Sequence, residues 1–238
     1  MPDQDAIPAY TDKLRRDGVV HMSSWYGYDY VEWLRQLASK LAFQIAAVDT
    51  GDVPAVSMKS GKFGYDANLR RYGVIRLYQI NRMVPDVNAF SVDPYIARMI
   101  DDYYYRRVKL QFTIAQYNYH GDEEQRGWHI DSAKHQFKAF LYLSDVGEAN
   151  GPLGYVRGSH KPSVAMDDVL NRVKQQGVKE RSDGSRPSDV DIELLGEPTA
   201  YPGIPGDVVL ADTRGAHRGM PVAEAHSRLA LVNYYVLK

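Results

Sequence analysis

The chain has 238 residues, of which 44% are hydrophobic and 25% charged, as is usual for a folded globular protein. Its 29 basic and 30 acidic residues leave a net charge of −1, so the overall charge gives no reason to expect a nucleic acid or an anionic membrane as partner. The chain has no cysteine, which excludes disulfides, thiolate metal sites and a cysteine nucleophile. No stretch approaches the roughly 18 apolar residues of a membrane span. The first residues lack the apolar core of a signal peptide, so we expect a cytoplasmic protein.

Helices dominate the predicted elements of the N-terminal half. A short polar helix is expected over residues 9–17, followed by a strand over 18–22 and a long amphipathic helix over 28–48. The Gly- and Pro-containing stretch 49–64 predicts a loop, and 70–83 a basic strand. A further helix is expected over 92–105, with Asp93 as its N-cap and Pro94 at its first position.

From about residue 107 the pattern changes to short β segments separated by Gly, Asn, Asp or Pro, which favours an all-β sandwich or barrel. An insertion over about 163–200 contains one predicted helix and a polar run, 179–191. We expect this run to be a mobile surface loop, with a lid over a pocket as the alternative. The chain is expected to form one domain over 1–238, in which residues 1–106 pack on a β core of 107–238.

The segment "GWHIDS" at 127–132 is the strongest chemical signal. On a strand, His129 and Asp131 point to the same face while Ile130 points to the other. His217, in "LADTRGAHRG", is the best candidate for a third ligand. Two imidazoles and one carboxylate match the facial triad of non-haem Fe(II) oxygenases, although other divalent metals also bind such a set and a structural hydrogen bond is the simpler alternative. Arg228, eleven residues after His217, offers a planar fork for the far carboxylate of 2-oxoglutarate.

The segments "WHID", "NGPLGYVRGSHK", "GDVVLADTRGAHRG" and "SRLALVNYY", with the early "DKLRRDGVVHM", resemble the phytanoyl-CoA dioxygenase-like family of Fe(II)/2-oxoglutarate oxygenases. This resemblance implies a mainly β fold, a double-stranded β-helix (jelly roll, cupin-like) with N-terminal and peripheral helices. It also implies that His129, Asp131 and His217 bind iron and that Arg228 holds 2-oxoglutarate.

The resemblance suggests further cosubstrate contacts. Phe140 falls where the family often packs a residue against 2-oxoglutarate, and Gln116 and Asn118 are candidate polar contacts. Related enzymes often place a hydroxyl residue two positions after the distal histidine, where this chain has Gly219. Thr113 or a tyrosine such as Tyr117 would then have to supply the hydroxyl.

The implied activity is hydroxylation, or another oxidation, of a C–H bond in a small metabolite or natural-product intermediate. Dioxygen is consumed, and succinate and carbon dioxide are coproducts. Desaturation, cyclisation and epimerisation start from the same chemistry and stay open. Two other classes also remain: a cupin-like metalloprotein that does not use 2-oxoglutarate, and a jelly-roll binding module without catalysis. Arg76 or Arg82 is a candidate for receiving an anionic or polar substrate. The sequence indicates neither the substrate nor the oligomeric state.

Overall fold

The computed structural model describes residues 4–50, 64–65, 73–121, 127–131, 137–175 and 184–238. The helical elements are η1 (Gln4–Ala6), α1 (Ile7–Asp17), α2 (Tyr28–Thr50), α3 (Ile80–Met83), η4 (Pro85–Val87), α4 (Asn88–Ser91), α5 (Pro94–Tyr104), α6 (Val164–Gln175) and α7 (Asp189–Leu195). The strands are β1 (Val19–Met22), β2 (Gly64–Tyr65), β3 (Val74–Tyr78), β4 (Val108–Tyr119), β5 (Ile130–Asp131), β6 (Phe137–Tyr142), β7 (Leu153–Val156), β8 (Gly184–Ser185), β9 (Pro198–Tyr201), β10 (Val208–Asp212), β11 (His217–Gly219) and β12 (Ser227–Leu237).

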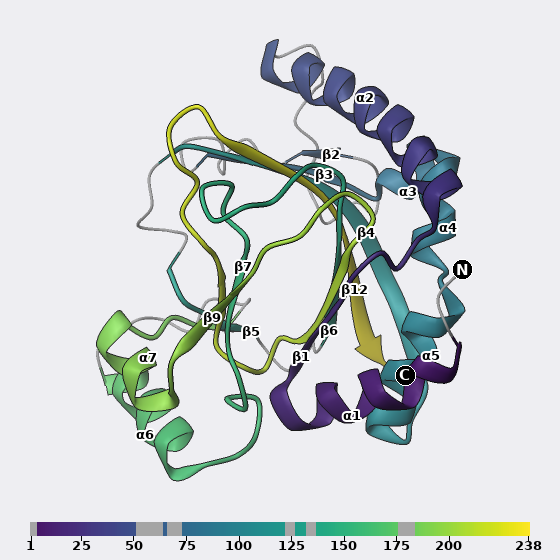
Figure 1. The fold of residues 1–238 in the computed structure, drawn as a ribbon. Coiled ribbons are helices and arrows are strands. Elements are labelled where there is room, and N and C mark those ends of the chain that lie inside the picture. Colours follow the sequence, from purple (N-terminus) through teal and green to yellow (C-terminus); the bar gives the residue numbers. More distant parts are fainter. Residues whose placement is uncertain (1–3, 51–63, 66–72, 122–126, 132–136, 176–183) are drawn as a thin grey trace.

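The strands form two facing layers. A seven-stranded sheet has the order β1-β10-β6-β12-β4-β3-β2, and it faces a smaller sheet of order β11-β7-β9 beside the pair β5-β8 (Figure 1). From β4 to β12 the chain passes back and forth between the layers, with β4, β6, β10 and β12 in the large sheet, β7, β9 and β11 in the small sheet, and β5 and β8 in the separate pair. All of these pairings are antiparallel. This alternation is a double-stranded β-helix, so the predicted jelly-roll fold is confirmed.

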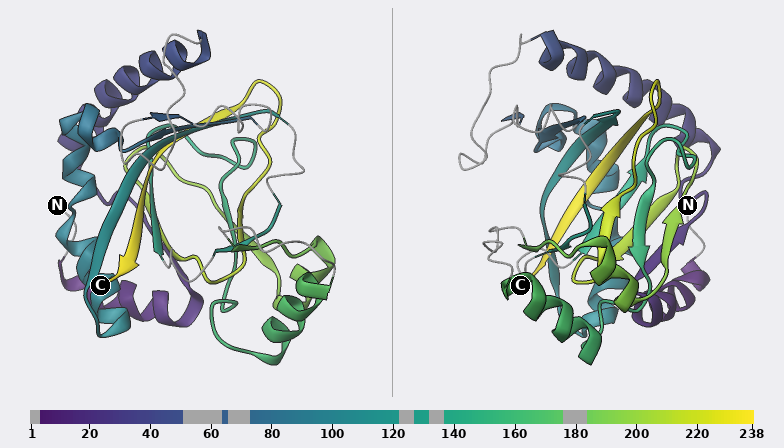
Figure 2. Two further views of the ribbon diagram at one scale, coloured as in Figure 1. Left: turned by 180° about the vertical axis from the view of Figure 1, so that it is seen from behind. Right: turned by 90° about the vertical axis from the view of Figure 1, so that its left-hand side faces the viewer.

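Strand periodicity separates three apolar cores. Along β12 and its neighbours, one set of alternate residues packs between the sheets with Leu153 and Tyr155 of β7. The other set packs under the N-terminal helices, in a core that also contains residues of α1, α2 and α5. A third core lies on the outer side of the small sheet under α6 and α7. The helices thus cover both outer faces of the barrel (Figure 2).

The predicted N-terminal helices are present with small shifts of boundary. Asp93 caps α5 by accepting hydrogen bonds from the backbone N–H groups of Tyr95 and Ile96, as the sequence predicts. Gly18 ends α1 with φ 78°, and a Cβ there would lie 2.3 Å from the Tyr155 hydroxyl, so only glycine fits. The predicted strand 70–83 is shorter, because the chain leaves the sheet after Tyr78 and turns into α3.

The 163–200 insertion contains more secondary structure than predicted. Its polar run contributes β8, which pairs with β5, and then α7, whose first turn has a capping box between Ser188 and Asp191. The run is therefore not loop throughout, because 184–185 form β8 and α7 begins at Asp189, and its mobility stays a prediction. Residues 179–183 lie outside the described residues, as does most of the predicted loop 49–64. In the described part of the chain, no helix combines the length and apolarity needed to cross a bilayer.

Candidate active site

A backbone bridge pairs His129, just before β5, with His217 at the start of β11. The two residues exchange both of their backbone hydrogen bonds, each with an N···O distance of 2.9 Å. Their ring centroids lie 4.1 Å apart. Asp131 is fixed in the same way, because its N–H donates to the carbonyl oxygen of Thr213 at 2.9 Å. The spacing of the three residues is thus set by main-chain pairing.

The alternation of side chains aims all three into the barrel. Trp128, Ile130 and Ala216 point outward and pack in the core under α6 and α7. Their neighbours His129, Asp131 and His217 point to the opposite face, where the ligand atoms all lie within 4.8 Å of one another. Ile130 therefore separates His129 from Asp131 because an apolar residue is required on the outer face.

Both imidazoles are held in the tautomer that a metal requires. Nδ1 of His129 lies 3.2 Å from the carbonyl oxygen of Gly127, and Nδ1 of His217 lies 2.9 Å from that of Gly215. A carbonyl only accepts, so each Nδ1 carries the proton and each Nε2 keeps its lone pair. Nε2 of His129 lies 4.0 Å from Oδ1 of Asp131, and Nε2 of His217 lies 3.7 Å from Oδ2. The buried Nε2 of His217 has no hydrogen-bond partner among the described residues.

The site also favours the charges that a metal centre needs. Burial, with a smaller contribution from His217, lowers the pKa of His129 well below its ordinary value. Burial lowers the pKa of His217 to about 4, against the opposing effect of Asp131. Although burial opposes ionisation of Asp131, Lys138 and the two imidazoles lower its pKa below the usual range. At neutral pH the triad thus offers two neutral imidazoles and one carboxylate, a donor set that fits ferrous iron.

Arg228 lies on the opposite wall, in the interior face of β12, and is 3% exposed. Its guanidinium donates to Oδ1 of Asn118 at 2.9 Å and to the carbonyl oxygen of Gly151. A buried guanidinium has the planar geometry that binds a carboxylate through two parallel hydrogen bonds.

The sequence as a whole matches one family model, Phytanoyl-CoA dioxygenase (PhyH), over residues 14–230. The chain belongs to this family.

Individual relatives are more distant. An ectoine dioxygenase of Bordetella parapertussis (strain 12822) is 28% identical over 116 residues, a match that spans 46% of this chain but 37% of the relative. Among solved structures, EctD from S. alaskensis with 2-oxoglutarate and 5-hydroxyectoine has a TM-score of 0.66 at 18% identity, covering 99% of this chain and 78% of that one. The epimerase SnoN, in complex with Fe3+, alpha ketoglutarate and nogalamycin RO, has a TM-score of 0.65 at 16% identity, covering 98% and 84%. At these identities the structural matches establish a shared jelly-roll fold.

Other residues predicted for the PhyH cosubstrate site also face the barrel interior. Phe140 lies on β6 opposite Val232, in the core between the sheets. Asn118 accepts from Gln116 as well as from Arg228, and Gln116 accepts from Nε of Arg76, each at 2.9 Å. These bonds form a polar chain across β3, β4 and β12.

Two candidates for the missing hydroxyl are not brought to Arg228. Thr113 has odd register on β4, so it points to the helix side, where it donates to Asn233 at 2.7 Å and contacts Ser91. Tyr117 faces the same way and packs against the outer core. Both are one residue out of phase with Gln116 and Asn118, which explains the error.

Another hydroxyl, that of Tyr142, experiences the positive charge of Arg228. The charge of Arg228 acts on the phenol of Tyr142, although burial is the larger effect and raises the pKa of Tyr142. This hydroxyl already donates to the carbonyl oxygen of Tyr201 at 2.8 Å. A Cβ built on Gly219 would lie 3.4 Å from Nη2 of Arg228, so position 219 borders the guanidinium and glycine leaves space there.

Sequence reasoning missed Lys138. Its Nζ lies 2.6 Å from Oδ2 of Asp131, and the residue is 8% exposed within the wholly buried strand β6. The signal was present in "FKAFLY", because period-two alternation places Lys138 on the same face as Phe140 and Tyr142.

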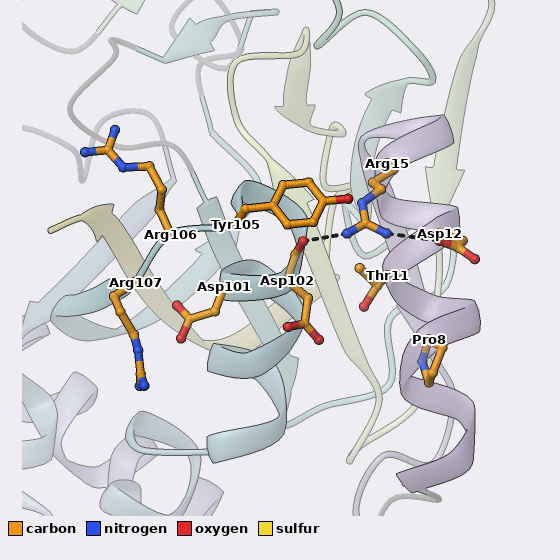
Figure 3. Close-up of a pocket in the computed structure, with 9 residues that line it drawn as sticks. All are labelled: Pro8, Thr11, Asp12, Arg15, Asp101, Asp102, Tyr105, Arg106 and Arg107. Atoms are coloured by element: carbon orange, nitrogen blue, oxygen red, sulfur yellow. Dashed lines mark hydrogen bonds and ion pairs between the residues drawn. The ribbon is translucent and has the colours of Figure 1, made fainter.

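A groove on the molecular surface lies apart from these residues. It has a volume of about 530 Å³ and runs between α1 and α5, where Arg15 bridges Asp12 and the backbone carbonyl of Asp102 (Figure 3). None of the triad residues, Lys138 or Arg228 lines it. Its lining mixes acidic and basic side chains, and we assign it no part in the active site.

Proposed function

We propose that this PhyH protein is an Fe(II)- and 2-oxoglutarate-dependent dioxygenase. The observation that carries the proposal is a cluster of two histidines and one carboxylate, of which His217 is fully buried, in the layer that faces the large sheet with its buried Arg228. The family match and the iron and 2-oxoglutarate complexes among its structural relatives support the same conclusion. When bound, ferrous iron supplies the reaction with dioxygen that leads to oxidation of the substrate.

The chain's own residues have distinct roles in this proposal. His129, Asp131 and His217 hold the metal on one side and leave the other side open to ligands. Arg228 binds the far carboxylate of 2-oxoglutarate, with Asn118 and Gln116 orienting the guanidinium and Phe140 packing against the cosubstrate. The apolar side chains between the sheets exclude water from the reacting groups. Succinate and carbon dioxide are the expected coproducts.

A small molecule is the proposed substrate, oxidised at a C–H bond. Arg76 gives a hint of its chemistry, because the interior face of β3 also carries Tyr78 and pairs with the polar face of β4. Burial alone would lower the pKa of Arg76, but Tyr234, Tyr78 and Asp131 raise it, so its charge persists beside the site. We propose that Arg76 faces a polar or anionic group of the substrate. A cytoplasmic location stays a prediction from the sequence.

An anaerobic titration tests the class. Metal-free protein receives Fe(II) and then 2-oxoglutarate, and the weak visible charge-transfer band of the chelate is recorded for the wild type and for Arg228→Ala. We expect the band in the wild type and at least a tenfold higher 2-oxoglutarate requirement in the variant, because a charged pair is lost. Iron binding without any band would instead support a metalloprotein that does not use 2-oxoglutarate.

Oxygen consumption with a panel of small molecules tests the substrate proposal. Each acid in the panel is paired with its neutral amide, and Arg76→Leu is assayed beside the wild type. Stimulation by acids over amides in the wild type, reduced in the variant, supports the role of Arg76. Equal stimulation by both members of each pair contradicts it.

A further inference from the structure

Lys138 stands out because a buried ammonium is costly. The other residues of β6 are apolar or aromatic, and Lys138 points with Phe140 and Tyr142 into the space between the sheets. Removing an ammonium from water costs several kcal/mol unless a partner of opposite charge compensates. An apolar side chain would fill the same position without this cost. A role at the adjacent metal site gives a reason for a lysine here.

The contacts of Lys138 lead to one oxygen of one ligand. Its Nζ is 2.6 Å from Oδ2 of Asp131 and 5.0 Å from the ring centroid of Tyr234, which lies opposite it on β12. The side chains of Lys138 and Asp131 are 10% and 7% exposed, so solvent screens this ion pair little. The ion pair of Lys138 is therefore with Oδ2 of Asp131.

A carboxylate held in this way has one oxygen left for a metal. A divalent cation placed on Oδ2 would lie against the ammonium, and at this burial two like charges repel strongly. Oδ1 is free of that repulsion and lies 4.0 Å from Nε2 of His129, while Nε2 of His217 lies 3.7 Å from Oδ2, the oxygen that the ammonium contacts. Without Lys138 nothing in the described contacts of Asp131 prevents both of its oxygens from binding one metal.

We propose that Lys138 is a positioning residue that reserves Oδ2 of Asp131 and restricts this ligand to a single metal bond through Oδ1. Three coordination positions then stay open, two for 2-oxoglutarate and one for dioxygen. A carboxylate that chelated through both oxygens would occupy one of the three. The inference rests on the proposed function and adds to it the control of how many positions are available.

Two separate readouts test this role. Fe(II) affinity is measured under anaerobic conditions by competition with a chromophoric chelator, and 2-oxoglutarate binding by the charge-transfer band, for wild type, Lys138→Met and Lys138→Arg. We expect Lys138→Met to bind Fe(II) as tightly as the wild type or more tightly, yet to need at least ten times more 2-oxoglutarate for half of the band. Lys138→Arg keeps a cation on Oδ2 and should stay within about threefold of the wild type.

Arg218→Met is the matched control. Arg218 is next to His217 in sequence, but its side chain points outward, with Cζ 5.7 Å from the ring centroid of Trp128. Like Lys138→Met, the Arg218→Met substitution removes one positive charge. Both of its affinities should match the wild type. If Lys138→Met does not fold, Lys138→Gln replaces it, because its side chain is polar but carries no charge, and an increase in the 2-oxoglutarate requirement is again expected.

The outcomes separate this inference from the proposed function. A wild type that binds iron but shows no band overturns the proposed function itself. A wild-type band with an unchanged 2-oxoglutarate requirement in Lys138→Met overturns the role of Lys138 alone. Loss of Fe(II) binding in folded Lys138→Met also overturns it, because Lys138 would then support the ligand and not restrict it.

Discussion

The hydrogen bonds of His129 and His217 to backbone carbonyls fix the tautomer of both rings before a metal binds. With Nδ1 donating in both rings, protonation has to place a charge on Nε2, which is buried in His217 and partly buried in His129. The pKa of each ring is therefore low, at about 4 for His217. In the unfolded chain the same rings have a pKa near 6.5, so folding and protonation of the triad compete.

This competition predicts the pH dependence of the metal-free protein. Below about pH 6.5 the unfolded chain binds protons that the folded chain does not, so the free energy of unfolding should fall as the pH falls from 7 toward 4.5. The pKa of Asp131 is lowered as well, and the stability that it contributes is lost only as the pH falls below the ordinary carboxyl pKa, outside this window. His217→Gln should reduce the slope by up to about 1.4 kcal/mol per pH unit. Urea unfolding at several pH values measures the slope of the free energy of unfolding against pH, with His226→Gln as a control at an exposed histidine. An unchanged slope in His217→Gln would contradict the low pKa.

Gly219 gives a prediction in the direction of improved binding. A serine there would start from a Cβ 3.4 Å from Nη2 of Arg228 and carry a hydroxyl into the proposed carboxylate site. One added hydrogen bond contributes about 0.5–1.5 kcal/mol, so Gly219→Ser should lower the 2-oxoglutarate requirement about two- to tenfold. Gly219→Ala is the control, since it adds the Cβ without the hydroxyl. Equal effects of both substitutions would show that space, and not the hydroxyl, matters.

At the scale of elements, α5 shows how one side chain joins several parts of the fold. Oδ1 of Asp93 accepts from the backbone at the start of α5, while Oδ2 accepts from Nε1 of Trp25 and the hydroxyl of Tyr26, each at 3.0 Å. The sequence predicted the cap from Asp93 and Pro94. It did not predict the two aromatic donors, because they lie 67 and 68 residues away.

Removing this carboxylate should cost more than a cap alone. Loss of an N-cap costs about 1 kcal/mol, and a buried donor left without a partner adds about 1–3 kcal/mol. Asp93→Ala should therefore lower the free energy of unfolding by about 2–4 kcal/mol, measured by urea denaturation. Asp93→Asn keeps one acceptor oxygen, so its free energy of unfolding should lie between those of the wild type and Asp93→Ala. Fe(II) affinity of the folded variants should not change, and a large loss would mean that α5 also supports the metal site.

The elements that the sequence missed are those with little local signal. β5 has two residues, and its partner β8 comes from a polar stretch in which no alternation is visible. Lone short strands are fixed by the ladder they join, and here that ladder contains Thr213, His217 and Gly184. By contrast α5 has its own N-cap and helical periodicity and was predicted within a few residues. Thr113 was misplaced because face assignment on β4 depends on a register that the sequence leaves open.

At the scale of the whole molecule, the ligands and the proposed anchor belong to different sheets. His129, Asp131 and His217 come from the layer formed by the small sheet and the β5-β8 pair, while Arg228 and Lys138 come from the large sheet. The spacing of His129, Asp131, His217 and Arg228 along the chain was enough to infer their association, because the jelly roll interleaves the two layers. The contact between Lys138 and Asp131 depends on how the layers are packed together, which no local pattern reports.

The core under α6 and α7 should therefore affect the metal site more than an equal defect elsewhere. Ile192 and Ile96 are both buried, the first in this core and the second under the N-terminal helices. Ile192→Ala and Ile96→Ala should each cost about 2–4 kcal/mol of stability. Only Ile192→Ala should also weaken Fe(II) binding, because the cavity lies in the core that contains Ile130. Thermal shift with and without Fe(II) compares them, and equal shifts in both variants would contradict the coupling.

The reciprocal backbone bridge between residues 129 and 217 has a consequence for engineering. Because N–H and C=O groups hold the two Cα atoms, the positions of these ligands do not depend on which side chains they carry. Exchanging one imidazole for a thiolate or a carboxylate should leave the scaffold in place while changing which metal it prefers. The backbone thus fixes where the ligands lie, and single side-chain substitutions can change which metal binds there.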